Sequence, residues 1–274
     1  MKLGLGLSLT GMQRRRDTPA FIFANGEPGV WLDPSDPATV FSDTAGTTQA
    51  GIGDPVALVL DKSGNGNHAT QPTLASRPIL READGLRYLE FDGVDDFLAT
   101  PTITPGTDKA QVFAGVRKLN DNVYRWICAL RSTRDTNGTF TVSASVFADL
   151  GEAGGRRNWA MEVRGTIRAV RATTASFAAP LTSVLMAQIH NDGSDNIGSL
   201  RVDGQPSALA PATIDSGSAT NFANAVFDIG GDTVNSNFIN GNIYSLLVRF
   251  GPNLDTATIE RTERYVAKRT GVSL

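Results

Sequence analysis

The sequence predicts an all-β protein, a two-sheet antiparallel β-sandwich with one C-terminal helix and an extended N-terminal arm. Many short runs rich in β-branched and aromatic residues are spread along the chain, and turn signals with glycine, asparagine or aspartate separate them. The chain has 274 residues, of which 28 are glycine and 41% are hydrophobic. This is enough apolar sequence for one large core, and sandwiches of this size commonly form a single domain.

The arm is predicted over residues 1–20, where leucines recur with period two and glycine or serine stands between them. In an extended strand such leucines share one face, and an arginine run follows them. Two interpretations stay open: a terminal strand or tail of the protein's own sandwich, and an arm that adds to a neighbouring subunit. The apolar run is short, and arginines stand where a cleavage site belongs, so we expect no export signal. The arm residues are Leu3, Leu5, Leu7, Leu9, Arg14, Arg15 and Arg16.

Residues 21–274 are predicted to form one sandwich domain. Asp36 followed by Pro37 predicts a short helical turn through Val40, because aspartate caps helices and proline suits the first helical position. The expected strands are Val56–Leu60, Arg87–Phe91, Ala110–Lys118, Arg125–Arg131, Thr139–Phe147, Trp159–Arg164, Thr166–Ala172, Val184–His190, Gly198–Val202, Ala225–Ile229 and Asn242–Phe250.

One helix is expected near the C-terminus. Asp255 can cap it, and Gly271 suits its C-terminal end. Ile259 and Val266 belong to its apolar stripe, with Tyr265 alongside. We expect the helix to pack against one sheet or a sheet edge.

The segment between Asp61 and Leu98 is the most informative part of the sequence. Its first half, DKSGNGNHAT, is a polar loop in which glycine and asparagine favour tight turns. Its second half, RYLEFDGVDDFL, alternates apolar and other residues and breaks at Asp92-Gly93, which predicts strand, turn, strand.

These two motifs carry a family resemblance. DKSGNGNHATQ followed by a strand ending in FDGVDDFL resembles the laminin-G-like, concanavalin-A-like jelly-roll domains of bacteria and their phages. The likeness extends to GVWLDPSD and DTAGT upstream, and to GNIYSLLV and YVAKRTGV downstream, so it covers roughly residues 24–274. It implies a concanavalin-A-like sandwich. Because members with this opening often occur in phage or prophage virions, it also implies a virion protein made in the host cytoplasm.

Composition excludes several other classes. A formal net charge of −3 argues against a protein that wraps nucleic acid. No apolar run approaches the ~20 residues that cross a bilayer. The single cysteine, Cys128, excludes an internal disulfide framework and lies in an apolar run that predicts a buried, inert thiol.

Catalytic and zinc sites find little support. Some sandwiches of this class are glycoside hydrolases, and EFDGVD, which begins at Glu90, superficially resembles their catalytic strand. Gly93 interrupts that strand, and its last acid is Asp95 rather than glutamate, so we predict no catalytic residues. His68 and His190 lack further ligands at zinc spacing, and no nucleophile-elbow motif accompanies either of them.

A calcium ion is the one cofactor left open. Asp92, Asp95 and Asp96 can supply some of the six to eight oxygens that calcium requires, and several lectin-like relatives carry calcium at the sandwich rim. The alternative is that these aspartates cap the turn through its own N–H groups.

Carbohydrate binding depends on exposed aromatic faces beside amides and carboxylates. The candidate residues are Trp31, Asp61, Asn65, Asn67 and His68, although a core position remains the alternative for Trp31. The expected function is a non-enzymatic virion protein of a phage or phage-like particle, for decoration, a head fibre or the tail. It would bind other virion proteins through its arm and assemble as a homo-oligomer. The alternative is an adhesion module that binds a host-surface glycan, and a glycan depolymerase ranks last.

Overall fold

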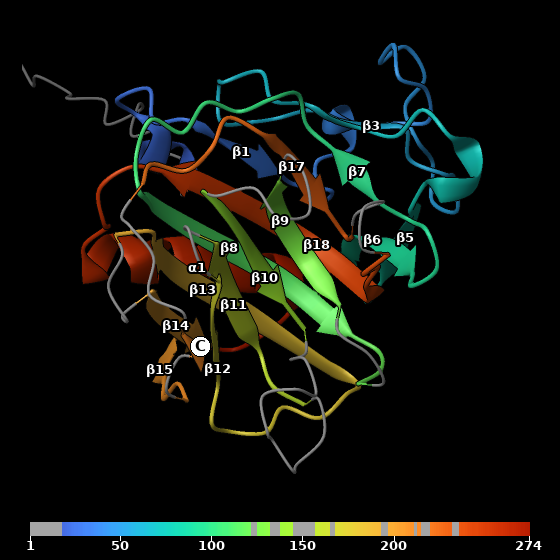
Figure 1. Ribbon diagram of the computed structural model, residues 1–274. Coiled ribbons are helices and arrows are strands. Elements are labelled where there is room, and N and C mark those ends of the chain that lie inside the picture. The colour runs from blue at the N-terminus through green and yellow to red at the C-terminus, as the bar shows by residue number, and fades with distance from the viewer. Residues whose placement is uncertain are drawn as a thin grey trace, which may run out of the picture.

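Two antiparallel β-sheets stack face to face in the computed structural model, and one α-helix covers the outer face of one sheet (Figure 1). The structure describes residues 18–121, 125–131, 138–144, 157–164, 168–192, 197–210, 213–214, 220–231 and 236–274. The predicted two-sheet sandwich with a C-terminal helix is therefore confirmed. No helix in these ranges has both the length and the apolar character needed to span a bilayer.

Sheet A has eight strands within the described residues, in the order β15-β14-β13-β8-β18-β6-β5, and β1 also pairs with β18. Since β1 pairs with residues 246–249 of β18 and β6 pairs with residues 240–243, these two strands lie end to end along one edge of β18. The bounds are β1 Gly29–Leu32, β5 Ile79–Ala83, β6 Leu86–Asp92, β8 Lys109–Lys118, β13 Leu181–His190, β14 Gly198–Val202, β15 Gln205–Ser207 and β18 Asn240–Phe250.

Sheet B has ten described strands in the order β16-β12-β11-β10-β9-β17-β7-β4-β3-β2. Its bounds are β2 Val40–Phe41, β3 Leu58–Val59, β4 Ala69–Thr70, β7 Leu98–Ala99, β9 Trp126–Arg131, β10 Thr139–Ser143, β11 Ala160–Arg164, β12 Arg168–Ala172, β16 Thr213–Ile214 and β17 Val226–Ile229. The described connections contain three short 3-10 helices, η1 Pro19–Phe23, η2 Pro37–Thr39 and η3 Leu74–Ser76.

The core fills the space between the sheets because side chains alternate along each strand. In β8, Val112, Ala114 and Val116 belong to this core, whereas Phe113 belongs to a second cluster on the other face of sheet A. Trp159 is fully buried between the sheets, and Cys128 is buried there as predicted.

Helix α1, Thr256–Thr270, packs on the outer face of sheet A against β13, β8 and β18. The Asp255 carboxylate accepts a hydrogen bond from the Thr258 N–H, and Gly271 ends the helix at φ 71°. Ile259, Tyr265 and Val266 are buried in the second cluster, so the predicted cap, end and apolar stripe are all confirmed.

The expected strands are present wherever their residues are described, with shifted ends; Phe147 and Thr166 lie outside the described residues. The Asp92-Gly93 turn is confirmed, and Gly93 has φ 79°. The two strands that flank it do not pair with each other, because β6 belongs to sheet A and β7 to sheet B. This turn carries the chain from one sheet to the other.

Candidate functional site: a groove on the outer face of sheet B

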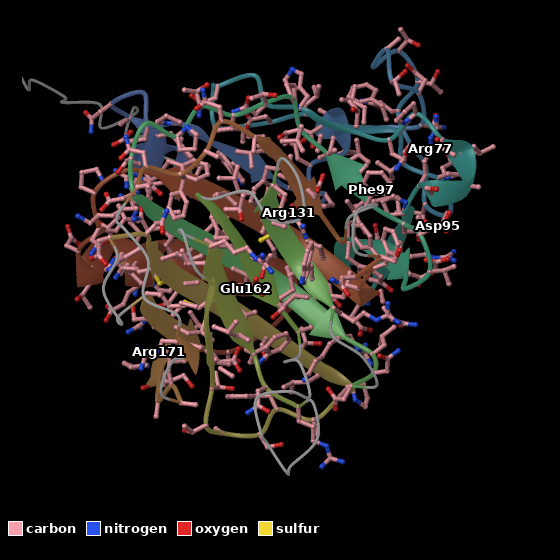
Figure 2. All side chains as sticks on the ribbon, viewed as in Figure 1. Arg77, Asp95, Phe97, Arg131, Glu162 and Arg171 are labelled. Atoms are coloured by element: carbon pink, nitrogen blue, oxygen red, sulfur yellow. The ribbon has the colours of Figure 1, made fainter. Side chains whose placement is uncertain are left out.

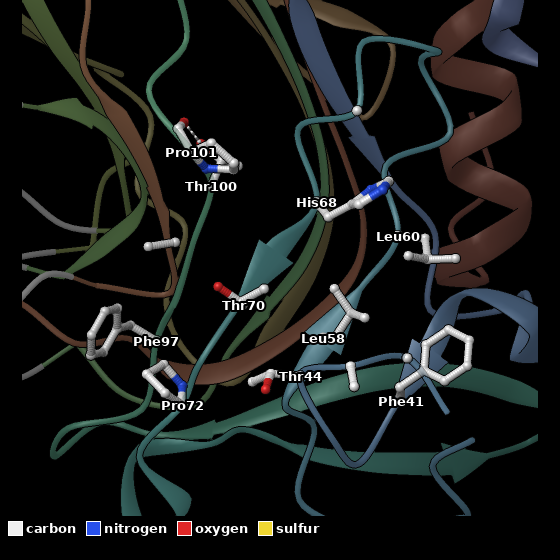
Figure 3. Close-up of a pocket in the computed structure, with 14 residues that line it drawn as sticks. Phe41, Thr44, Leu58, Leu60, His68, Thr70, Pro72, Phe97, Thr100 and Pro101 are labelled. Atoms are coloured by element: carbon white, nitrogen blue, oxygen red, sulfur yellow. Dashed lines mark hydrogen bonds between the residues drawn. The ribbon is translucent and has the colours of Figure 1, made fainter. Parts of the chain in front are cut away.

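Four short strands at one end of sheet B form the floor of an open groove of about 700 Å³ (Figure 3). Each strand turns one residue into the sandwich core and its neighbour outward to the groove. The inward residues are Val40, Val59, Ala69 and Leu98, and the outward residues are Phe41, Leu58, Thr70 and Ala99. The loops around this floor contribute Thr44, Ala45, Gly46, Leu60, Gly66, His68, Pro72, Phe97, Thr100 and Pro101.

The groove combines apolar walls with a few polar groups. Phe97 is half-buried and supplies aromatic surface at one side of the floor, whereas Phe41 at the other side is only 9% exposed. The Thr100 hydroxyl is already engaged, since it donates to the Pro101 carbonyl at 2.8 Å and accepts from the Phe227 N–H at 3.0 Å. Within the described part of the chain, the hydroxyls of Thr44 and Thr70 make no hydrogen bond and can therefore bind a ligand.

The loop between β3 and β4, which contains the predicted binding residues Asp61, Asn65, Asn67 and His68, borders this groove. The Asp61 carboxylate holds this loop together through hydrogen bonds. Asp61 accepts hydrogen bonds from the N–H groups of Trp31, Ser63 and Asn67 at 2.9, 2.8 and 3.0 Å, and from the Ser63 hydroxyl at 2.7 Å. The Lys62 N–H donates to the Trp31 carbonyl at 2.8 Å. Asp61 thus fastens the loop to the outer edge of β1.

The two asparagines complete this attachment. The Asn65 amide donates to the carbonyls of Glu27 and Gly29 at 3.0 and 3.2 Å, and the Asn67 amide donates to the Gly29 carbonyl at 2.7 Å. These bonds take the place of a neighbouring strand, which would otherwise pair with the open edge of β1. Asp61, Asn65 and Asn67 therefore shape the loop beside the groove, and the Asp61 carboxylate and the two amide nitrogens are directed at the protein's own backbone.

His68 is the predicted binding residue that lines the groove (Figure 3). Its Nδ1 accepts a hydrogen bond from the Asp61 N–H at 3.0 Å. This bond fixes the neutral ring in the tautomer that carries its proton on Nε2. Since no described residue accepts from Nε2, this N–H is available to a ligand.

Trp31 lies elsewhere. It is 3% exposed, and it packs in the cluster beneath α1, edge-on to the Tyr265 ring at a centroid distance of 5.6 Å. Its ring faces are covered and cannot stack on a sugar. The prediction that Trp31 binds carbohydrate is therefore wrong, and the alternative of a core position holds.

The three aspartates of the second motif lie together, with carboxylate oxygens within 4.8 Å of one another. Asp92 accepts from the N–H groups of Val94 and Asp95 at 2.8 and 3.3 Å, so it caps the turn. Asp96 accepts from the Asp92 N–H at 3.0 Å, and Asp95 accepts from the Ser76 hydroxyl at 2.8 Å. The capping role is confirmed, and calcium binding stays a prediction.

Asp96 is the buried member of this group, at 5% exposure. Burial raises its pKa to about 7, and the negative charges of Asp92, Asp95 and Glu90 act in the same direction. Protonation, or a bound cation, would relieve this crowding of carboxylates.

The strand that resembles a hydrolase motif uses its acids structurally. The Glu90 carboxylate accepts from Nε and an Nη of Arg81 on the neighbouring strand β5, at 3.2 and 3.1 Å. Asp92 caps the turn that follows. Both acids thus have structural partners in the described part of the molecule.

Sequence reasoning missed a second polar region, on the outer face of β9, β10 and β11 (Figure 2). There the Arg131 guanidinium lies 4.3 Å from the centroid of the Trp126 ring, and Glu162 pairs with Arg164 at 3.3 Å. Arg131 and Glu162 are 6% exposed. A signal was present, because Thr139, Thr141 and Ser143 alternate with buried apolar residues in β10.

The predicted arm residues Leu3, Leu5, Leu7, Leu9, Arg14, Arg15 and Arg16 lie outside the described residues. The first residue that the structure describes is Thr18, just before η1. There the buried Arg249 donates to the Ile22 carbonyl at 2.8 Å and to Glu27 at 3.0 Å, which ties the start of the domain to sheet A.

Comparison with known proteins relates the fold to several solved structures. No protein-family model matches the sequence, and no curated protein matches it either. Domain 4 of AbnA, an extracellular GH43 arabinanase from Geobacillus stearothermophilus solved with arabinotriose, matches with a TM-score of 0.57 and 11% identity. The match covers 86% of this chain and 97% of that domain.

Two larger proteins contain a similar fold. A structure from a study of botulinum neurotoxin type C and two ganglioside molecules matches with a TM-score of 0.55 and 11% identity, over 91% of this chain and 53% of that one. Trypanosoma rangeli sialidase, solved with 2,3-difluorosialic acid, matches with a TM-score of 0.53 and 14% identity, over 89% of this chain and 33% of that one. The chain thus spans about half of the first protein and about a third of the second. At these identities, the property that the three structures share with this chain is the β-sandwich fold.

Proposed function

We propose that this protein is a non-catalytic glycan-binding domain and that the groove on the outer face of sheet B holds the glycan. One observation carries the proposal: an open groove of about 700 Å³ joins apolar and aromatic lining to the hydroxyls of Thr44 and Thr70 and to Nε2 of His68, which have no hydrogen-bond partner among the described residues. Small-ligand sites commonly measure ~300–1,000 Å³ and combine apolar lining with a few orienting polar groups. A sugar presents both surfaces that such a groove needs, an apolar C–H face and a ring of hydroxyls.

The structural neighbours support this reading. The descriptions of these three proteins name arabinotriose, gangliosides and a sialic acid derivative, so each protein is described together with a sugar. The match covers 97% of the domain that was solved with arabinotriose. That domain is therefore the most direct parallel for a sandwich that binds a sugar on its own.

The non-catalytic part of the proposal is supported by the lining itself. A glycoside hydrolase ordinarily needs two carboxyl groups beside the scissile bond, ~5–5.5 Å apart in retaining enzymes. The described lining residues include no carboxylate. Glu90 and Asp92, the acids of the hydrolase-like motif, serve an ion pair and a turn.

We also propose that copies of this domain are carried on a phage or phage-like particle and attached through the N-terminal arm. The support is the resemblance of the two sequence motifs to virion domains and the leucine period of the arm. Particles assembled with a chain that lacks residues 2–16 should fail to incorporate the protein. Normal incorporation would rule out the arm as the attachment.

The binding proposal is tested by an array of neutral and acidic oligosaccharides, probed in calcium and in EDTA. Ala45 is exposed and lines the groove, so Ala45→Trp should fill it while the fold is retained. Ala178 is exposed in the loop between β12 and β13, and Ala178→Trp is the matched control. We expect wild type and the control to bind the same glycans, and Ala45→Trp to lose binding at least tenfold.

A finer variant probes a single polar contact. Thr70→Val keeps the shape of the side chain and removes the hydroxyl, so affinity should fall about two- to tenfold, the range expected for one hydrogen bond. Equal binding by wild type and Ala45→Trp would exclude the groove as the site. Absence of any bound glycan would exclude the function.

A further inference from the structure

We infer that the groove selects uncharged glycans and discriminates against acidic ones such as sialylated or uronic sugars. This inference rests on the proposed function and adds the chemical class of the ligand. Its first support is the lining. None of the described residues that line the groove is an aspartate, a glutamate, a lysine or an arginine. A carboxylate in the groove would therefore lose water without gaining an ionic partner from these residues, which is costly.

The loops that border the groove disfavour a bound anion further, because they carry aspartates. Asp43 precedes the wall residues Thr44–Gly46, and hydrogen bonds from the N–H groups of Thr47 and Thr48 lower its pKa to about 2. Asp95 stands two residues before Phe97 in the opposite wall (Figure 2). Both groups are placed to repel a negative ligand.

The cations of the same loops are directed elsewhere. Lys62 pairs with Asp36 at 2.5 Å and with Asp33 at 3.6 Å. The Arg77 guanidinium donates to the backbone carbonyls of Gln71, Ser42 and Pro72 at 2.9, 3.1 and 2.9 Å. Selective recognition of a carboxylate usually relies on a bidentate arginine, and this arginine holds the loops together instead.

The groups that remain suit neutral sugars. The hydroxyls of Thr44 and Thr70 can donate to or accept from ligand hydroxyls, and Nε2–H of His68 can donate. The half-buried Phe97 ring offers apolar surface to the C–H face of a sugar, with a smaller contribution from the 9% of Phe41 that is exposed. A short neutral oligosaccharide uses both kinds of contact at once.

The test measures matched neutral and acidic probes by calorimetry with the full chain: lactose against 3′-sialyllactose, and galactotriose against trigalacturonate, with arabinotriose as a further neutral probe. We expect binding to at least one neutral probe. Each acidic probe should bind about tenfold more weakly than its neutral counterpart at ~0.01 M ionic strength. This difference in affinity should become smaller at ~1 M, because the Debye length falls from about 30 to about 3 Å.

A charge variant separates electrostatics from shape. Ala45→Lys places a cation at an exposed position of the wall, and Ala45→Gln is its uncharged control of similar length. Ala45→Lys should bind acidic probes several-fold more tightly than Ala45→Gln does, whereas the affinities of these two variants for neutral probes should differ by no more than about twofold. Acidic probes that bind wild type as tightly as neutral ones would overturn the selectivity and leave the binding function standing. Failure of every probe, with no glycan bound on the array, would overturn both.

Discussion

Asp33 is a fully buried carboxylate at the end of β1, and removing its charge should destabilise the fold strongly. The Tyr265 hydroxyl of α1 donates to it, and the Ser35 N–H donates to it at 3.2 Å. Two cations pair with it, Arg269 of α1 at 3.4 Å and Lys62 of the loop between β3 and β4 at 3.6 Å. One carboxylate thus joins sheet A, the helix and the loop beside the groove.

The size of the effect follows from these contacts. Asp33→Asn keeps the shape but leaves two cations without their buried partner, and losing one partner of a buried pair costs about 3–5 kcal/mol. The side chains of Arg269 and Lys62 are 33% and 22% exposed, so water compensates both in part. We therefore expect the unfolding free energy to fall by about 2–3 kcal/mol, at or just below the lower limit of that range.

The assay is equilibrium urea denaturation at pH 7, with the free energy of unfolding extrapolated to water. Asp36→Asn is the matched control, because Asp36 pairs with the same Lys62 but is 37% exposed. An exposed pair contributes about 0–1 kcal/mol, and asparagine retains the cap of η2. If Asp33→Asn cost no more than Asp36→Asn, the reasoning that burial makes Asp33 a structural hub would be refuted.

Three further predictions concern other buried groups. The pKa of Asp96 is raised to about 7 in the folded protein, compared with about 4 in the unfolded chain. The protonated carboxyl therefore contributes its full stabilisation below about pH 4, and this contribution is lost as the pH rises through about 7. Asp96→Asn should therefore stabilise the fold by roughly 2–4 kcal/mol at pH 8.5 in EDTA and hardly at all at pH 4; equal shifts in urea midpoints at both values would contradict this. Gly230→Ala should cost more than about 2 kcal/mol in urea denaturation, because the new methyl meets the Phe91 ring at a φ of 84°, whereas Gly85→Ala at φ 74° in open space should cost about 1 kcal/mol; similar losses would contradict the packing argument. Burial raises the pKa of the Cys128 thiol, so iodoacetamide should modify it only in denaturant, and rapid modification of the native protein would contradict its placement in the core.

The sequence predicted elements whose signals are local. Helix α1 has its cap at Asp255 and its end at Gly271, and long strands such as β8 and β18 carry many apolar residues in a row. Partners distant in sequence were not predictable in this way. Trp31 follows a glycine-rich loop and suggested exposure, yet it is buried by a helix that begins more than two hundred residues later.

The groove escaped sequence reasoning because its floor consists of strands of two residues each. A strand of that length has one inward and one outward residue, so it shows no period. The turn at Asp92-Gly93 hid the arrangement further, since a hairpin and a crossover between sheets begin with the same dipeptide.

The DKSGNGNH loop shows why a polar loop is weak evidence for a binding site until its hydrogen bonds are known. Its carboxylate and amides could serve a sugar or the backbone, and the choice depends on whether an unpaired strand edge lies within reach. Here the edge of β1 is open, and Asp61, Asn65 and Asn67 satisfy it. The same bonds hold His68 against the groove, with its Nδ1 engaged and its Nε2 available. It follows that Asn67→Ala should weaken glycan binding indirectly, through loss of order in the loop, whereas Thr70→Val should weaken it with the stability of the fold unchanged.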